Sequence, residues 1–352
     1  MTDSPSNETV TPRARIAAAL RAAERILLVN HVDPDGDTLG STLALALALE
    51  GLGSGIEKRV TVGSDGGVPA NFAYLPGAAR VLREHPVGAA FDLALTMECG
   101  TLSRCGRFAS VVAQAPLIAA IDHHESHTVY AQLDDWDPRA AAAGEMTADL
   151  IRLLEAPITP PIATALLTAL ATDTGVFRFP TVRPETLRLG AALMEAGGNL
   201  TAIVEAVYEQ RSLAATRLLG YALLRTTLAE DGAVAYTTLT ESLARAAGAR
   251  PEDSAGIVGA LRAIAGVKVA VVFEETPDGI SVSIRARGGV QAHVIAEALG
   301  GGGHPAAAGC VVPPPMEQAV ARTLEAVREE LGRWSASRRG AAPAEAARTF
   351  GA

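Results

Sequence analysis

Residues 25–52 read RILLVN-HVDPDGD-TLGSTLALALALEGL, and this stretch decides the fold class. Residues 25–30 are a short apolar run typical of a buried strand, which ends abruptly in the polar segment 31–37. Residues 38–52 are apolar nearly all round, as in a buried helix. A buried strand that leads through a polar loop into a buried helix is typical of a parallel α/β sheet. We therefore expect an α/β protein.

The same alternation continues on both sides of this stretch. Further apolar runs that predict strands lie at 59–62, 91–97 and 117–121, and helical stretches lie at 13–24, 145–154 and 161–172. Short strands that alternate with helices predict a mainly parallel, doubly wound sheet with helices on both faces. We expect this first domain to cover residues 13–198.

The second half of the chain has a different pattern. Residues 199–230 are predicted to form a helical linker, and residues 231–334 a smaller α/β domain, with a cleft between the two domains. Its expected strands and helices lie at 233–239, 267–274, 279–286, 291–299 and in an amphipathic stretch that ends near residue 334. Residues 1–12 and 335–352 are predicted to be disordered tails.

Composition excludes several classes of protein. The 352 residues are 49% hydrophobic, which supplies a sizeable core, and no apolar run approaches the roughly 20 residues of a membrane helix. Three cysteines are too few for a disulfide framework, so we expect them to be free. The net charge of −9 argues against a broad basic surface for duplex DNA, but it allows a short anionic substrate in a local pocket. We expect a cytoplasmic location and no membrane partner.

The pattern His31-x-Asp33-x-Asp35 follows the first strand directly. Ligands bind at the carboxyl ends of strands in open α/β sheets, and imidazole with carboxylates suits a divalent ion such as Mn²⁺. The alternative is an acidic cap for the next helix, with Asp37 as the capping residue. Taken alone, this motif does not separate the two interpretations.

Acidic residues also end three other apolar segments. Glu98 follows the run 91–97, Asp122-His123-His124 follows the run 117–121, and Asp173 ends a long apolar helix. Independent surface loops do not usually all place an acid at such a point. The set therefore favours a shared site with Asp122 as the residue that orients a histidine. The acidic stretch 134–137 is predicted to be a turn and a helix cap.

The charges of this set suit two divalent cations. His31 and His123 are neutral ligands, and the other candidate ligands are four carboxylates, Asp33, Asp35, Glu98 and Asp173. Two cations held in this way activate a water for phosphoryl displacement. We expect two divalent metal ions, Mn²⁺ above all, as cofactors.

A separate anion site is predicted in the second domain. The strand 281–287 carries Arg285, and a glycine run Gly300-Gly301-Gly302-Gly303 precedes His304. Glycines let backbone N–H groups converge on an anion, and arginine binds phosphate with two hydrogen bonds. A flexible hinge is the alternative for the glycine run. The nearby arginine favours phosphate binding.

Taken in order, these motifs resemble the DHH phosphoesterase superfamily, in the branch with a DHH-associated C-terminal domain. The likeness is nearest to its bifunctional oligoribonucleases and adenosine bisphosphate (pAp) phosphatases, and it covers residues 13–333. The resemblance implies a manganese-dependent hydrolase that converts short single-stranded RNA to mononucleotides and pAp to AMP. It also makes a homodimer plausible. A phosphodiesterase for cyclic or linear dinucleotides and a nucleotide-binding module with a degraded site are the alternatives.

The resemblance also implies a role for each motif residue. His31 and Asp33 would hold one ion, Asp35, His123 and Asp173 the other, and Glu98 would bridge both. His124 would face the scissile phosphate, and Asp122 would orient a histidine. The substrate's far phosphate would be held by Arg285, Gly301, Gly302, Gly303 and His304. One residue departs from the family pattern, because Glu98 stands where the family usually carries Asp.

Overall fold

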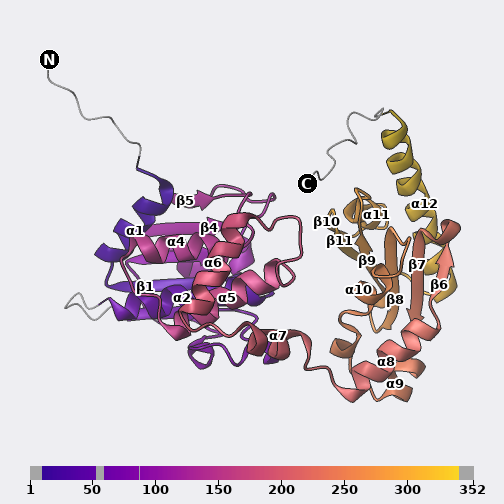
Figure 1. Cartoon of the computed structure of the whole chain (residues 1–352), viewed down its shortest axis with the longest axis horizontal. Helices are drawn as coiled ribbons and strands as arrows, with labels where there is room; N and C mark the ends of the chain where they lie inside the picture. Colours follow the sequence, from indigo (N-terminus) through magenta and orange to yellow (C-terminus); the bar gives the residue numbers. More distant parts are fainter. Residues whose placement is uncertain (1–9, 53–58, 87, 341–352) are drawn as a thin grey trace, which may run out of the picture. The chain divides into compact units, whose positions relative to one another are not determined.

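The computed structural model describes residues 10–52, 59–86 and 88–340 of the chain (Figure 1). The chain divides into two compact units, residues 1–210 and 211–352. The division falls inside the predicted linker, because α7 (Leu200–Tyr208) belongs to the first unit and α8 (Leu213–Leu224) to the second. We describe each unit by itself.

A parallel sheet forms the centre of the first unit. Its strands are β1 (Arg25–Asn30), β2 (Arg59–Gly63), β3 (Leu93–Met97), β4 (Leu117–Asp122) and β5 (Leu133–Trp136). Their spatial order is β2-β1-β3-β4-β5, and every pair is parallel. The predicted parallel sheet with flanking helices is therefore confirmed. β5 is a correction, since the stretch 134–137 was expected to be a turn.

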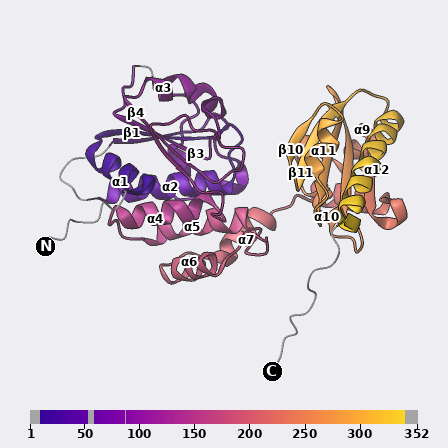
Figure 2. The same ribbon diagram turned by 90° about the horizontal axis from the view of Figure 1, so that it is seen from above.

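The two faces of this sheet pack against different helices, as Figure 2 shows for α2 and α3. Along β1, Ile26 and Leu28 join the core that contains α2, whereas Leu27 and Val29 pack with the smaller core around α3. Alternate side chains of a strand point to opposite faces, so a run of apolar residues serves both layers. The helices of the first unit are α1 (Pro12–Ala22), α2 (Gly36–Gly51), α3 (Ala109–Gln114), α4 (Ala143–Leu153), α5 (Pro160–Asp173), α6 (Pro184–Glu195) and α7.

Helices α2 and α5 pack very closely, and glycines on α2 make this possible. A Cβ built on Gly40 would lie 2.4 Å from the carbonyl oxygen of Ala165, and one on Gly36 would lie 2.4 Å from a methyl group of Thr172. Any larger residue at these positions would push the two helices apart. The close approach brings the start of α2 to the end of α5, where Asp173 lies.

The second unit is built on a mixed sheet. Its strands lie in the order β10 (Gly302–His304), β11 (Ala307–Val312), β9 (Gly279–Ala286), β8 (Val269–Thr276), β7 (Val234–Leu239) and β6 (Thr227–Ala229). Only the pair β7–β8 is parallel among these described strands. Its helices are α8, α9 (Glu241–Ala247), α10 (Ile257–Arg262), α11 (Ala292–Glu297) and α12 (Met316–Gly340).

The predicted boundary of the C-terminal tail was wrong. Helix α12 continues to Gly340, so residues 335–340 are helical, although they were predicted to be disordered. Residues 1–9 and 341–352 of the predicted tails lie outside the described residues. All three cysteines are free and buried, as expected. Among the described residues, no helix is both long enough and apolar enough to cross a membrane.

Candidate metal centre

The ends of three neighbouring strands position most of the predicted site. In the sheet, β1, β3 and β4 lie side by side and run in the same direction. His31 follows β1, Glu98 follows β3, and His123 follows β4. Because the carboxyl ends of parallel strands meet at one edge, these side chains lie close together. Asp173 reaches the same place from the end of α5.

His123 lies at the centre of this arrangement. Its Nδ1 is 3.2 Å from the carbonyl oxygen of Ala140, so Nδ1 donates this hydrogen bond and Nε2 is the nitrogen that faces the cluster. Nε2 lies 3.1 Å from Glu98 Oε1, 3.5 Å from Asp173 Oδ2 and 3.7 Å from Asp37 Oδ2. Three carboxylates that converge on one ring nitrogen repel one another unless a cation or protons lie among them.

Asp37 is the site residue that the sequence analysis missed. It was considered only as a helix cap, but Asp35 caps α2 by accepting hydrogen bonds from the backbone N–H groups of Asp37 and Thr38. The Asp37 side chain is fully buried and accepts hydrogen bonds from the N–H groups that begin α4, at Ala143 and Gly144. Two acids, Asp35 and Asp37, lie at the start of α2. Only the packing of α2 against α4 and α5 shows that the Asp37 side chain is the buried one.

Asp33 does not join the other predicted ligands. Its side chain is 81% exposed, and Asp33 Oδ2 lies 3.4 Å from Nη1 of Arg104. The prediction assumed that alternate residues after β1 point the same way. However, β1 ends at Asn30, and the backbone then bends so that the N–H of Val32 donates to the carbonyl of Arg104. The period of two residues holds only within a strand, so it does not extend to Asp33.

Glu98 begins the turn that follows β3. Its backbone has φ 56°, a left-handed conformation that costs roughly 1–2 kcal/mol for a residue with a side chain. The side chain is buried against His123, and its second oxygen, Oε2, has no hydrogen-bond partner among the described residues. His31 Nδ1 is likewise buried without a partner in the described part of the chain. Both atoms are therefore available as ligands.

Three overlapping groups of ligand atoms result from this packing. The groups are Glu98 with His123 and His124, His31 with Asp35 and Glu98, and Asp37 with His123 and Asp173, each with its atoms within 4.8 Å of one another. Glu98 and His123 each belong to two of the groups. The residues fit divalent cations, because they combine unpartnered buried atoms, carboxylates and an oriented imidazole.

The acids of this cluster have raised pKa values, because each carboxylate is buried close to the others. Burial raises the pKa of Asp37, and the charges of Asp173 and Asp35 raise it further. Burial also raises the pKa of Glu98, and the charge of Asp37 adds to this effect. The pKa of Asp173 is raised for the same first reason. A bound cation would remove this repulsion and let the carboxylates ionise.

His124 lies beside the cluster and is oriented by Asp122, as predicted for a histidine of this motif. Asp122 Oδ1 lies 2.7 Å from His124 Nδ1 and accepts the backbone N–H of the same residue. Burial would raise the pKa of Asp122, but the hydrogen bonds from His124 and His127 lower it to about 2. The hydrogen bond that the His124 ring donates to Asp122 raises the pKa of His124 despite the burial of the ring.

The predicted anion site in the second unit is only partly available. The N–H groups of Gly300 and Gly301 donate to carbonyls of Glu297 and Ala296, so they close the end of α11 and do not face an anion. Gly302 and Gly303 belong to β10 at the edge of the sheet, so the expected loop is a hairpin. The side chain of His304 lies outside the described part.

Arg285 is the clearest cationic group of that region. It lies half-buried on β9, and Nη1 donates to the carbonyl of Ile284. Burial lowers the pKa of Arg285, and the charge of Arg262 on α10 lowers it further. Among the described residues, neither arginine forms an ion pair with a carboxylate. Two partly buried cations without an acid attract an anion.

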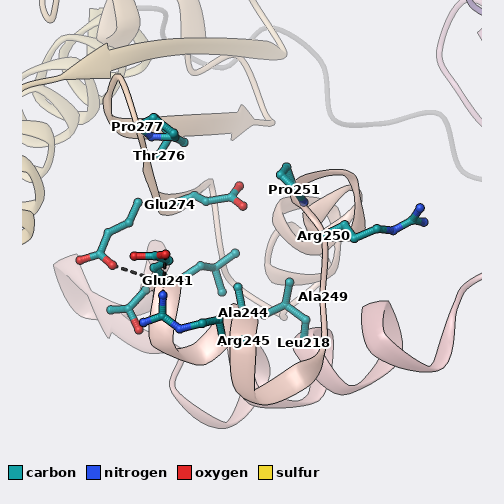
Figure 3. Close-up of a pocket in the computed structure, with 13 residues that line it drawn as sticks. Leu218, Glu241, Ala244, Arg245, Ala249, Arg250, Pro251, Glu274, Thr276 and Pro277 are labelled. Atoms are coloured by element: carbon teal, nitrogen blue, oxygen red, sulfur yellow. Dashed lines mark hydrogen bonds and ion pairs between the residues drawn. The ribbon is translucent and has the colours of Figure 1, made fainter.

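A cavity of about 430 Å³ lies elsewhere in the second unit, at the ends of β7 and β8 (Figure 3). Its charged residues are paired within the described structure: Glu241 with Arg245, Glu274 with Ser254, and Glu275 with the backbone N–H of Glu241. The residues that line it include none of the predicted site residues. It therefore offers no unpaired charge of the kind seen in the first unit.

Family models match both halves of the chain. The model of the DHH family, N-terminal domain, matches residues 25–172, and that of the DHHA1 domain matches residues 231–333. The chain belongs to the DHH family. The resemblance that the ordered motifs predicted is thereby confirmed.

Named relatives narrow the class further. The chain is 37% identical over 323 residues to the bifunctional oligoribonuclease and PAP phosphatase NrnA of Thermus thermophilus, which covers 90% of this chain and 94% of the relative. It is 26% identical to the protein of the same name from Bacillus subtilis, over 82% of this chain and 90% of the relative. These relatives are named as hydrolases, and the prediction of an enzyme of this class is confirmed.

Solved structures agree with this fold. An exopolyphosphatase-related protein from Bacteroides fragilis matches 90% of this chain and 96% of its own, with a TM-score of 0.84 and 25% identity. Exonuclease RecJ bound to manganese matches 91% of this chain and 95% of its own, with a TM-score of 0.56 and 14% identity. The second likeness shows the fold alone.

Proposed function

We propose that this chain is a manganese-dependent phosphoesterase that hydrolyses short oligoribonucleotides to mononucleotides and pAp to AMP. The observation that carries this proposal is the convergence of carboxylates of Glu98, Asp173 and Asp37 on His123 Nε2. The names of the relatives from Thermus thermophilus and Bacillus subtilis support the choice of substrate.

Two divalent cations would be held by the cluster described above. We assign them to His31, Asp35, Asp37, Glu98, His123 and Asp173, with Asp37 in place of the Asp33 of the sequence analysis. Mixed imidazole and carboxylate ligands suit Mn²⁺. Bound there, the ions would supply Lewis acidity to the phosphoryl oxygens and lower the pKa of water.

His124 is assigned to the scissile phosphate. Asp122 holds the Nδ1 side of the ring, and we assign the Nε2 side to the substrate. The raised pKa of His124 favours its charged form, which stabilises negative charge on phosphoryl oxygens. Arg285 in the second unit is assigned to a further phosphate of the substrate, because arginine pairs with phosphate through two hydrogen bonds.

A substrate panel tests this proposal. Purified protein with Mn²⁺ is given a linear diribonucleotide, pAp and a cyclic dinucleotide, and products are separated by ion-exchange chromatography. We expect mononucleotides from the first and AMP from the second, with no turnover after exhaustive chelation and recovery on adding Mn²⁺. Turnover of the cyclic compound alone, binding without turnover, or full activity after chelation would each contradict the proposal.

A further inference from the structure

A second histidine lies behind the Asp122–His124 pair. The ring of His127 is 1% exposed and lies between two carboxylates. Its Nδ1 lies 2.9 Å from Asp122 Oδ2, and its Nε2 lies 2.8 Å from Asp134 Oδ1. Each ring nitrogen of His127 is therefore within hydrogen-bond distance of a different carboxylate, and the ring links Asp122 to Asp134.

This contact completes the hydrogen bonding of Asp122. The Oδ1 atom of Asp122 serves only His124, and the Oδ2 atom serves His127. The carboxylate is fully buried, so no solvent would replace a lost donor. With both oxygens bound, the plane of the carboxylate is fixed, and with it the direction in which the His124 ring is held.

Residues of strand β5 contact His127 on the side away from Asp122. Asp134 and Trp136 are two residues apart, so they point to the same face of the strand. Asp134 accepts from His127, the ring of Trp136 stacks on that of His127 at 6.2 Å with an angle of 16°, and its Nε1 donates to the carbonyl of His124. The acidic stretch 134–137, which was expected to be a turn, therefore supplies the residues that hold His127 in place.

We propose that His127 is a positioning residue for hydrolysis: it fixes the carboxylate of Asp122, which in turn holds the ring of His124 toward the substrate. Asp134 acts one step further out by holding His127. The inference rests on the proposed function, because it gives His124 a substrate to face. It extends the site by two residues that coordinate no cation and touch no substrate.

Three substitutions of His127 separate its two hydrogen bonds. In His127→Asn the amide nitrogen takes the place of Nδ1 and reaches Asp122, whereas in His127→Gln it takes the place of Nε2 and reaches only Asp134. His127→Phe removes both bonds and keeps a ring against Trp136. We expect kcat on a diribonucleotide to fall about 10–100-fold in the Phe and Gln variants, as for other outer partners of a site. The Asn variant should recover most of this loss.

Two further readouts distinguish positioning from general damage. KM and the Kd for Mn²⁺ should stay unchanged in all three variants, because none of the proposed ligands is altered. In ¹⁵N spectra of histidine-labelled protein without manganese, recorded at a pH where the His124 ring is neutral, that ring should show one tautomer in the wild type and in His127→Asn. In His127→Phe it should show a mixture. His85→Phe, at a histidine that contacts Phe108 instead, is the matched control.

The possible outcomes are distinct. Wild-type kcat in His127→Phe, or equal loss in the Asn and Gln variants, would overturn the inference while leaving the proposed function intact. Joint loss of Mn²⁺ affinity and of kcat in His127→Phe would overturn it too, because the residue would then support the whole cluster. If the wild type hydrolyses nothing, the proposed function fails, and the ¹⁵N spectra still report whether His127 controls the His124 ring.

Discussion

The two units bury ionisable groups of opposite sign. In the first unit, carboxylates of Asp37, Glu98 and Asp173 are packed around one imidazole, and burial raises the pKa of each. In the second unit, the partly buried Arg285 and Arg262 have no acidic partner among the described residues. Each unit therefore gathers ionisable groups of one sign, and burial opposes the charged form of these groups.

The difference lies in how tightly each charge is held. The acids follow parallel strands or lie at helix ends that pack without free space, so their positions are fixed by the core. Arg285 lies on a mixed sheet, near the hairpin at its edge. The N–H groups of Gly300 and Gly301, which precede this hairpin, donate hydrogen bonds to carbonyls of α11. We expect substitutions in the first unit to abolish chemistry and substitutions in the second to weaken binding.

The largest difference in activity is expected between substitutions of Asp37 and of Asp33. Asp37→Asn should lower kcat by more than about 100-fold, since even outer partners of metal ligands cost 10–100-fold. Asp33→Asn should change it by no more than about fivefold, because an exposed ion pair is worth roughly 0–1 kcal/mol. Steady-state assays with Mn²⁺ measure both. The reverse order would return Asp33 to the metal site.

The next effect concerns the packing that brings Asp37 to Asp173. Gly40→Ala should lower the free energy of unfolding by about 1–3 kcal/mol, because its Cβ would meet the backbone of α5. Gly220→Ala on α8 has no atom within 4 Å of its Cβ and should gain about 0.5–1 kcal/mol. Calorimetry compares the two, and equal shifts would mean that the α2–α5 contact relaxes easily.

A smaller effect is expected at the second unit. Arg285→Met should raise KM for a diribonucleotide about tenfold with kcat unchanged, because a hydrogen bond to a charged group contributes at least about 1.5 kcal/mol. Arg188→Met, which removes an exposed ion pair on α6, is the control. A fall in kcat with constant KM would instead give Arg285 a part in the chemical step.

The smallest effect is a pH dependence of stability. Raised pKa values of Asp37 and Glu98 mean that the folded, metal-free protein binds more protons than the unfolded chain above their ordinary values of 3.8 and 4.5. Their contribution to stability is therefore present at lower pH and is lost as the pH rises through the raised values. Tm of chelated protein should fall as the pH rises above these ordinary values, and saturating Mn²⁺ should remove this fall. A rise in Tm with pH after chelation would show that these acids are ionised without a cation.

Much of the site could be predicted because strand ends are visible in sequence. An apolar run that stops at a polar residue locates His31, Glu98 and His123 without any tertiary information. Asp37 could not be separated from Asp33 in this way, because the choice depends on where β1 ends and how α2 meets α5. His127 and Asp134 were missed because the contact between them depends on the pairing of β5 with β4, and the stretch 134–137 was expected to be a turn.

By itself, the sequence determined the fold class, the family and the order of the strand-end motifs, because hydrophobic periodicity and local motifs are properties of neighbouring residues. Tertiary structure alone decided which acid faces His123, that residues 133–136 form a strand, and that Asp122 is held from two sides. The first two features depend on contacts between separate segments of the chain, and the third depends on the conformation of the loop that follows β4. Such contacts are selected by close packing and by the need of buried polar groups for partners, and neither is encoded in local spacing.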